Sequence, residues 1–397
     1  MGEHNLVILC GGKGTRIGKI TKNIPKPIIK INGINFLQHL INFYSKYNLK
    51  KIYLLAGYKG NMIKKIFHKK KFNLVDVECI IEKKPLGTGG SINLLPKSVK
   101  SFFLINGDSY IEHDFKNFIK FVKDKSAAMG LIENKNYKSN KILNKLFINS
   151  KKKIIISQKK NLMNAGIYFF KKNIFKEKIK KKSFSLENEI IPELIKNQKL
   201  FGKKLEGNFV DIGLYKNLDY AKKIIGNVSR PAIFLDRDGV IFRDFGYVNS
   251  LKRVVWTKNV FKILNKFKNY FIFIVTNQAG IARGYYSENN FLNFQKKIKN
   301  IFINHKIYIR DVKYCPHHPK YGKGIYKKKC LCRKPNNQMI TNILKNWNID
   351  KENSFFIGDS ETDLAAAKKS RIKFIKKENN EDFKDLFLKI QKKFKIY

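Results

Sequence analysis

The sequence predicts an α/β protein with two domains, and three observations support this prediction. Short apolar strands alternate with amphipathic helices along the chain. The chain has 397 residues, which is enough for about two domains of ordinary size. The first run of alternating elements ends within residues 215–230, and a new apolar strand begins at Pro231. Hydrophobic residues make up 43% of the chain, so each half can bury its own core.

Each half has its own set of predicted elements. In the first half we expect buried strands at residues 5–10, 51–56, 77–82 and 101–106, and helices at 35–47 and 61–70. In the second half we expect strands at 231–236, 270–276 and 353–358, and helices at 260–269 and 289–302. The predicted domains are residues 1–226 and 231–380, with a linker at 227–230 and a Lys-rich, solvated C-terminal helix at 381–397. The halves carry different motifs, so the chain has no internal repeat.

The formal net charge of +52 has two possible explanations. A nucleic-acid binder is one of them. Compositional bias is the other, and we favour it because nine of the 82 basic residues are arginine, the lysines are spread along the chain, and residues with AT-rich codons are abundant. We therefore expect no specific nucleic-acid partner. No apolar run approaches the ~20 residues of a membrane span, and the first residues show no signal segment. The odd number of cysteines, five, favours a reducing, cytoplasmic compartment.

A glycine-rich turn follows the first predicted strand. In GGKGTR, residues 11–16, the glycines let backbone N–H groups approach a phosphate chain, and Arg16 adds a cationic fork. A plain β-turn is the alternative, because the turn matches neither the dinucleotide fingerprint nor a P-loop. Asp108, in NGD after a strand, and Asp211, in VDIG, are placed to hold Mg²⁺ against a triphosphate. The alternative for either aspartate is a turn residue at a strand end.

The order of motifs GGKGTR, PKP, PLGTGG, NGD, NAG and VDIG resembles the sugar-1-phosphate nucleotidyltransferase family across residues 5–225. The resemblance implies a Rossmann-like, glycosyltransferase-A-type sheet and attack of a sugar phosphate on the α-phosphorus of a nucleoside triphosphate. It also implies roles for individual residues: the triphosphate would be held by Gly11, Gly12, Gly14, Thr15, Arg16 and Lys26, the base and ribose by Gly87, Thr88 and Gly89, the sugar by Asn164 and Glu187, and Mg²⁺ by Asp108 and Asp211.

Within that family the first half looks most like the heptose-1-phosphate guanylyltransferases, because GYKG follows the second strand and EKKPLGTGG comes later. Mannose-1-phosphate and muramic-acid-phosphate transferases are close neighbours. The residues do not separate GTP from other nucleoside triphosphates, so the base preference stays open.

Two carboxylates lie two residues apart after the first strand of the second half, in DRDG. Asp236 can attack phosphorus as a nucleophile, and Asp238 can protonate the leaving oxygen and later deprotonate water. Three further elements follow in order. Thr276 and Asn277 of TNQAG can hold phosphoryl oxygens, Lys334 can stabilise their charge, and Asp359 can complete a Mg²⁺ shell with Asp236 and Asp238. This set resembles the haloacid-dehalogenase phosphatase superfamily, which implies a Rossmannoid sheet and an aspartyl-phosphate.

The window at residues 315–335 concentrates soft metal ligands. The spacing gives Cys315, His317, Cys330 and Cys332, a Cys₃His set suited to a structural, tetrahedral Zn²⁺. His318 competes with His317, which we favour, and reduced surface thiols are the alternative to a metal. A zinc ion would pin this loop and aim Arg333 and Lys334 at the substrate.

This window, together with GIARGYY at 280–286, resembles the D-glycero-D-manno-heptose 1,7-bisphosphate 7-phosphatases. Histidinol-phosphate phosphatases share the cysteine pattern. The insertion after DRDG is too short for a separate cap domain, so we expect the zinc loop to shape specificity.

The two resemblances imply substrates that fit together, because removal of the 7-phosphate leaves a heptose 1-phosphate. We therefore expect a bifunctional enzyme that makes a nucleotide-activated heptose, with GDP-heptose for a bacterial lipopolysaccharide or related glycan as the product. One alternative is an enzyme for another sugar 1-phosphate, joined to a histidinol-phosphate-type phosphatase. A basic binding protein with degenerate sites is another, but it would lack carboxylates that this chain retains.

Overall fold

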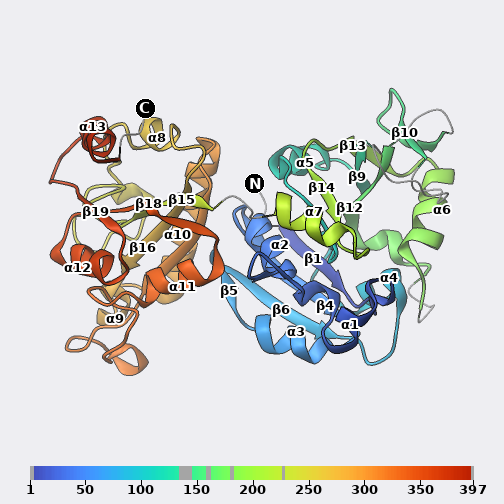
Figure 1. The fold of residues 1–397 in the computed structure, drawn as a ribbon, viewed down its shortest axis with the longest axis horizontal. Helices are drawn as coiled ribbons and strands as arrows, with labels where there is room; N and C mark the ends of the chain where they lie inside the picture. Colours follow the sequence, from blue (N-terminus) through green and yellow to red (C-terminus); the bar gives the residue numbers. More distant parts are fainter. Residues whose placement is uncertain (1–3, 134–144, 158–161, 179–182, 226–228, 395–397) are drawn as a thin grey trace. The chain divides into compact units, whose positions relative to one another are not determined.

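The computed structural model describes residues 4–133, 145–157, 162–178, 183–225 and 229–394. The chain divides into two compact units, one made of Met1–Tyr44 with Leu49–Ile225 and the other of Ser45–Asn48 with Gly226–Tyr397. Figure 1 colours residues 4–225 from blue to light green and residues 229–394 from yellow to red. The predicted linker at 227–230 lies partly outside the described residues, and Arg230 is already the first residue of a strand.

The first unit contains a large mixed sheet. Its strands run in the order β11-β10-β12-β7-β1-β4-β6-β5, and β9 pairs with β12 and β13. The strands are β1 (His4–Cys10), β4 (Leu49–Ala56), β5 (Lys71–Phe72), β6 (Val75–Ile81), β7 (Ser101–Asn106), β9 (Ala127–Glu133), β10 (Leu146–Ile148), β11 (Ile154–Ile156), β12 (Leu162–Lys171) and β13 (Phe201–Lys204). Strands β6, β4, β1 and β7 are parallel, whereas β12 is antiparallel to β7.

Two small antiparallel pairs complete the first unit. These are β2 (Lys30–Ile31) with β3 (Ile34–Asn35), and β8 (Ser109–Ile111) with β14 (Phe209–Asp211). The helices are α1 (Lys19–Asn23), α2 (Phe36–Ser45), α3 (Gly60–Phe67), α4 (Gly87–Gly90), α5 (Phe115–Phe121), α6 (Ile191–Lys196) and α7 (Asn217–Ile224). Short helical turns add η1 (Thr15–Ile17), η2 (Lys26–Ile28), η3 (Ser91–Leu94), η5 (Lys172–Phe175) and η6 (Leu186–Ile190).

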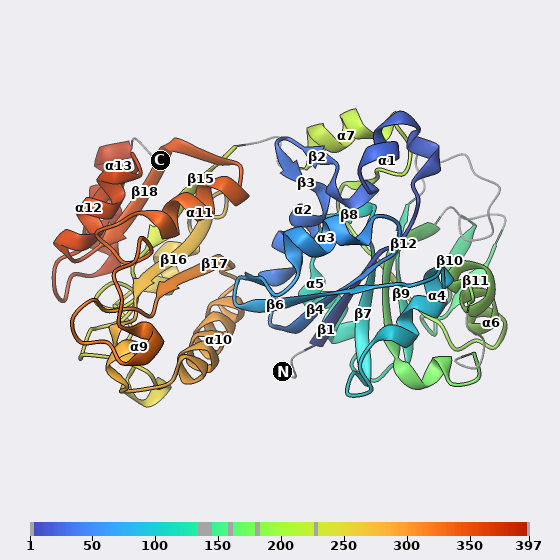
Figure 2. The same cartoon turned by 90° about the horizontal axis from the view of Figure 1, so that it is seen from below.

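Both faces of the first sheet are covered. On one face, side chains such as Leu104 and Phe170 join a buried cluster with Leu194 of α6. On the other face, the Phe103 ring packs against Phe115 of α5, with ring centroids 4.7 Å apart. Figure 2 shows the sheet nearly edge-on, with α2 and α3 to one side of it. This layered arrangement agrees with the apolar strand sequences, because strands covered on both faces need few polar residues.

The second unit is a parallel sheet with strand order β17-β16-β15-β18-β19. Its strands are β15 (Arg230–Leu235), β16 (Phe271–Asn277), β17 (Ile309–Cys315), β18 (Ile349–Gly358) and β19 (Lys373–Lys376). The helices are α8 (Val260–Leu264), α9 (Ala279–Arg283), α10 (Glu288–Asn304), α11 (Gln338–Asn346), α12 (Glu361–Lys369) and α13 (Phe383–Phe394), and short turns form η7 (Leu251–Arg253) and η8 (Gly324–Tyr326). Residues of α11 and α12 share a buried cluster with Phe234 and Phe356.

The predicted C-terminal helix exists as α13, but it is not simply a solvated cap. Its Phe383, Leu386 and Ile390 are buried, and Phe394 packs against Phe355 of β18. The lysines therefore occupy one side of an amphipathic helix whose other side belongs to the core.

The predicted fold class, α/β, is confirmed, and most predicted elements lie within a few residues of their expected bounds. The helix predicted at 61–70 ends earlier, at Phe67. The chain turns there because Lys69 takes a left-handed conformation (φ 58) and its N–H donates to Val77 O, which starts the β5–β6 hairpin. Among the described residues, no helix is long and apolar enough to cross a membrane.

Candidate active sites

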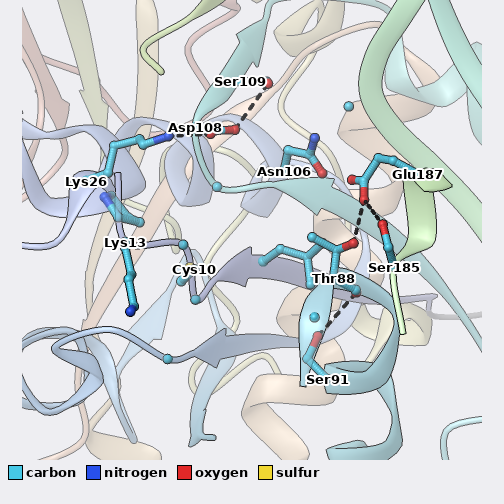
Figure 3. A pocket seen from close by; sticks show the side chains of 18 of the residues that line it. Cys10, Lys13, Lys26, Thr88, Ser91, Asn106, Asp108, Ser109, Ser185 and Glu187 are labelled. Atoms are coloured by element: carbon cyan, nitrogen blue, oxygen red, sulfur yellow. Dashed lines mark hydrogen bonds and ion pairs between the residues drawn. The ribbon is translucent and has the colours of Figure 1, made fainter. Parts of the chain in front are cut away.

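A cavity of about 1190 Å³ opens in the first unit where β1 and β7 end. Residues after β1, among them Gly11 and Gly12, and residues after β7, among them Asp108, line it. Gly107 lets these two strand ends approach closely, because a Cβ there would lie 2.3 Å from Leu9 O. The volume exceeds that of a usual single-ligand pocket, so the cavity has room for a nucleotide and a second small molecule. Figure 3 shows this cavity from close by.

Carboxylates and cations meet at one side of the cavity. The β8–β14 pair sets Asp211 opposite Ser109, so the chain brings Asp211 beside Asp108. Lys26 Nζ lies 2.8 Å from Asp108 Oδ2. Burial and the nearby Asp108 raise the pKa of Asp211 above its ordinary value, while Lys26 and Arg16 oppose that rise. The cluster therefore lacks positive charge, and its carboxylate oxygens are ligands of the kind that bind a divalent cation.

The glycine-rich turn contributes only part of its length to the cavity. Gly11, Gly12, Lys13 and Arg16 line it, whereas Gly14 and Thr15 do not. Gly14 takes φ 67, a left-handed conformation in which Thr21 Oγ1 donates to its carbonyl oxygen, so its glycine is explained by the turn itself.

The GTGG segment, residues 87–90, is hydrogen-bonded to residues 184–187, and Figure 3 shows the bond between Thr88 and Glu187. Thr88 Oγ1 donates to Glu187 Oε2 at 2.5 Å and accepts from the Leu186 N–H at 2.9 Å. The N–H groups of Gly89 and Gly90 donate to Phe184 O. A Cβ on Gly89 would lie 2.4 Å from the Phe184 ring, and Gly89 does not line the cavity. Its glycine therefore serves this packing, while Gly87 and Thr88 face the cavity.

Asn164 also lines the cavity, but its amide is already engaged. Its Nδ2 donates to Tyr168 Oη at 2.5 Å, and its Oδ1 accepts from the Gly166 N–H at 2.9 Å. Burial raises the pKa of Tyr168, so that hydroxyl stays protonated. These bonds fix the orientation of Asn164 at the cavity wall.

In the second unit, Lys334 is the centre of a buried ion cluster. Its Nζ lies 2.9 Å from Asp236 Oδ1 and 2.5 Å from Asp363 Oδ1, and it donates to Val275 O at 3.0 Å. Burial alone would lower the pKa of Lys334, but the two carboxylates raise it above its ordinary value. Burial raises the pKa of Asp236 to about 7, an effect that Lys334 opposes and Asp363 adds to.

Three carboxylates here could share a metal ion. Oxygen atoms of Asp236, Asp359 and Asp363 all lie within 4.8 Å of one another. Burial, with Asp363 nearby, raises the pKa of Asp359 to about 6. Elevated pKa values on clustered carboxylates indicate a place where a further cation would be stabilising. Hard oxygen donors of this kind suit Mg²⁺.

Asp363 was not among the residues selected from the sequence. It lies in the first turn of α12, where Ser360 caps the helix and donates to Asp363 Oδ2. It is fully buried, a state that aspartate adopts almost only when paired. The available signal was the second aspartate of GDSETD, four positions after Asp359.

Asp238 and Asn277 lie at the same sheet edge but contact other partners. Asp238 accepts hydrogen bonds from Arg237 on both carboxylate oxygens. The Asn277 amide is committed to Lys334, since Oδ1 accepts from its N–H at 3.0 Å and Nδ2 donates to its carbonyl at 3.1 Å. Thr276 is buried, and its Oγ1 accepts from Gln278. The substrate role predicted for Asn277 stays a prediction, and the structure gives this side chain a role in holding Lys334.

The four soft ligands predicted from the sequence come together beside this cluster. The three sulfur atoms of Cys315, Cys330 and Cys332 lie 3.2–3.5 Å from one another, and His317 Nδ1 lies 3.4 Å from Cys332 Sγ. The hydrogen bond with Cys315 lowers the pKa of Cys332 to about 5, which favours a thiolate. Three sulfurs and one imidazole fit a tetrahedral Zn²⁺ with metal–sulfur bonds of about 2.3 Å.

The competing ligand His318 points elsewhere. Its Nδ1 accepts hydrogen bonds from the N–H groups of Lys320 and Tyr321. Arg333, on the same loop, donates to His317 O at 3.2 Å. The geometry therefore favours His317 as the fourth ligand and ties Arg333 to the cluster.

Comparison with known proteins finds a different family for each of the two units. Residues 5–141 match the nucleotidyl transferase family, and residues 320–377 match the haloacid dehalogenase-like hydrolases. The chain is 42% identical over 137 residues to D-glycero-alpha-D-manno-heptose-1,7-bisphosphate 7-phosphatase of Burkholderia mallei, covering 34% of this chain and 72% of the relative.

Two further relatives match the first unit. D-glycero-alpha-D-manno-heptose 1-phosphate guanylyltransferase of Campylobacter jejuni is 33% identical over 226 residues, which cover 56% of this chain and 99% of the relative. The crystal structure of HddC from Yersinia pseudotuberculosis is 29% identical, with a TM-score of 0.48, and covers 55% of this chain and 98% of HddC.

A nucleotidyl transferase domain followed by a haloacid dehalogenase-like phosphatase domain therefore makes up this bifunctional enzyme. More particularly, the chain belongs to the families of its Campylobacter and Burkholderia relatives. Both family predictions made from the sequence motifs are thereby confirmed.

The buried pairing of Lys334 yields a first prediction. Asp363→Asn keeps the size of the side chain but removes the charge that faces Lys334 at 2.5 Å. Because a buried charge that loses a partner is strongly destabilised, Lys334 should shift, and phosphate release should fall at least about tenfold. The assay is phosphate release by the purified full chain. Asp385→Asn, at an exposed carboxylate of α13, is the control and should leave the rate unchanged. Equal rates in both variants would contradict a role for Asp363 in the site.

Proposed function

We propose that this enzyme makes a nucleotide-activated heptose in two consecutive reactions. The second unit removes the 7-phosphate of D-glycero-α-D-manno-heptose 1,7-bisphosphate. The first unit then transfers a nucleotidyl group, GMP from GTP, to the resulting heptose 1-phosphate. The observation that carries this proposal is the fusion itself, because the product named for one relative is the substrate named for the other. The transferase relative is named for the α anomer, which supports that anomer here, while the phosphatase relatives include both α and β names.

In the proposed phosphatase reaction, Asp236 is the nucleophile. Its carboxylate attacks the phosphorus and forms an aspartyl-phosphate, while Asp238 gives a proton to the leaving sugar oxygen. Asp238 then takes a proton from the water that releases phosphate. Lys334 lies 2.9 Å from Asp236 and can balance the charge of the transferring group. Thr276, at the end of the neighbouring strand, would hold phosphoryl oxygens, and Arg333 would contact the substrate.

In the proposed transferase reaction, the sugar phosphate oxygen attacks the α-phosphorus and pyrophosphate leaves. The attacking group is already an anion, so the chain needs to supply no base. Gly11, Gly12, Arg16 and Lys26 would hold the triphosphate from the cavity wall. Glu187, oriented by the Thr88 hydroxyl, would accept hydrogen bonds from sugar hydroxyls.

Both reactions fit a requirement for Mg²⁺, which would neutralise phosphate charge in each site. Asp108 and Asp211 would hold it in the first unit, and Asp236, Asp359 and Asp363 in the second. The Cys₃His cluster would hold Zn²⁺ in a structural role, since four protein ligands leave no position for water. The free thiols of this cluster fit a reducing compartment, so we also propose a cytoplasmic location.

Variants at single carboxylates should separate the two activities. Asp236→Asn should lower phosphate release at least about a thousandfold and leave nucleotidyl transfer to supplied heptose 1-phosphate intact. Asp211→Asn should do the reverse, because the charge that would hold Mg²⁺ is lost only in the first unit. Two assays are run separately. One measures phosphate release from the heptose bisphosphate, and the other measures pyrophosphate release with each of four nucleoside triphosphates. Loss of both activities in either folded variant would refute the assignment to two independent sites.

Zinc content provides a separate test of the cysteine cluster. The purified full chain should contain one zinc per chain by elemental analysis, and Cys330→Ser or His317→Ala should lose it. Because the loop that carries Arg333 and Lys334 would then loosen, phosphatase kcat/KM should fall at least about tenfold, about 1.4 kcal/mol. His318→Ala is the matched control and should keep both zinc and activity, since His318 bonds only to its own loop among the described residues. Zinc-free protein with normal phosphatase activity would rule the structural ion out.

A further inference from the structure

Arg237 stands between the two carboxylates of DRDG and is fully buried. Its guanidinium carbon lies 5.4–5.5 Å from the ring centroids of Phe242, Phe291 and Phe294. A cation in such surroundings is costly unless it is paired. The proposed chemistry of Asp236 and Asp238 leaves this side chain without a role.

Asp238 is the partner of this buried cation. Arg237 Nε donates to Asp238 Oδ2 at 3.0 Å, and Nη2 donates to Oδ1 at 2.9 Å. Nη2 also donates to Val248 O at 2.9 Å, which fixes the guanidinium from the other side. A bidentate pair of this kind sets the plane of the carboxylate as well as its position.

A third donor distinguishes the two oxygens of Asp238. Gln278 Nε2 donates to Oδ2 at 2.9 Å, and Gln278 is itself held by the Tyr286 hydroxyl, which donates to its Oε1 at 2.8 Å. Oδ2 therefore accepts two hydrogen bonds from the described residues, and Oδ1 accepts one. Each carboxylate oxygen has about two lone-pair positions, so Oδ1 retains one that is not used by these three hydrogen bonds. The Asp238 side chain is 17% exposed, which leaves it open to a bound molecule.

The backbone supports the same arrangement. Gly239 takes φ 80, and its N–H donates to Phe242 O at 2.9 Å. The Ile241 N–H donates to Arg237 O at 2.9 Å, so the turn after β15 closes on itself. Asp238 consequently has little freedom to turn away from Arg237.

We propose that Arg237 is a positioning residue that acts through Asp238: together with Gln278 it sets the plane of this carboxylate and leaves Oδ1 as the oxygen open to a bound substrate. This inference rests on the proposed phosphatase reaction. In the first step of that reaction the Asp236–phosphorus bond forms, the phosphorus–oxygen bond to the sugar breaks, and the leaving oxygen takes the proton that Asp238 supplies. In the second step Asp238 takes a proton from water as the water oxygen bonds to phosphorus and Asp236 leaves.

The experiment compares leaving groups, since only poor ones need protonation. Aryl phosphates from p-nitrophenyl to phenyl phosphate are hydrolysed by the full chain, by Arg237→Lys and by Asp238→Asn. For Arg237→Lys we expect kcat on phenyl phosphate to fall ~100-fold, as loss of general acid catalysis does. We expect KM to change little and p-nitrophenyl phosphate to be hydrolysed within about threefold of the normal rate, because its leaving group needs little protonation. Arg371→Lys, at an exposed arginine, is the control.

The double variant identifies the route of the effect. If Arg237 acts through Asp238, adding Arg237→Lys to Asp238→Asn should change kcat by less than about twofold. Equal losses on all aryl phosphates, or additive effects in the double variant, would overturn the proposal in favour of a purely structural arginine. Should Arg237→Lys fail to fold, Gln278→Leu removes one donor to Asp238 and should give a smaller effect with the same dependence on leaving group. Aryl phosphates make this test independent of the sugar, so hydrolysis of them without hydrolysis of the heptose bisphosphate would refute only the proposed substrate.

Discussion

The direction in which helices leave a parallel sheet places both candidate sites. In the first unit the parallel strands lie in the order β6-β4-β1-β7, and in the second the order is β17-β16-β15-β18-β19. In each order the strand numbers fall to that of the unit's first strand, β1 or β15, and the next strand in the sheet, β7 or β18, comes later in the chain. Chain connections on the two sides of this point lead to opposite faces, so a crevice opens at the strands' carboxyl ends. Asp108 follows β7, and Asp236 and Asp359 follow β15 and β18, so the key carboxylates of each unit lie at such a crevice.

Carboxylates concentrated at a strand end need cations, and each unit supplies a lysine from a separate loop. Lys26 reaches Asp108 from the turn after Pro25, and Lys334 reaches Asp236 and Asp363 from the cysteine-rich loop. Both lysines are largely buried, so their charges are committed to the site. The pKa values of Asp211, Asp236 and Asp359 are still raised, which means that one lysine per site does not satisfy the carboxylates. The same deficit in both units is the physical argument for a divalent cation in each reaction.

The sequence predicted the fold class, the main strands and the residues that follow directly after them. Site residues such as Asp108, Asp236 and Asp359 could be predicted because the end of a strand fixes where the next side chain lies. Asp363 could not, since its role depends on the Ser360 cap and on Lys334 arriving from another loop. The use of Gly89 against Phe184, and of Asn277 to hold Lys334, also depends on contacts between segments far apart in the chain. The charge pattern of DRDG indicated two carboxylates but gave no sign that Asp238 would be held by Arg237 and Gln278.

The central claim is that one chain carries out two phosphoryl transfers in a fixed order on the same sugar. The most direct measurement is phosphorus NMR of the full chain with heptose 1,7-bisphosphate, GTP and Mg²⁺ in one tube. The account predicts that the 7-phosphate signal disappears first, that heptose 1-phosphate appears transiently, and that phosphate and pyrophosphate finally form in equal amounts with GDP-heptose. Omission of GTP should stop the reaction at heptose 1-phosphate. Formation of a nucleotide-linked heptose that still carries its 7-phosphate, or release of phosphate with no later pyrophosphate, would contradict the account.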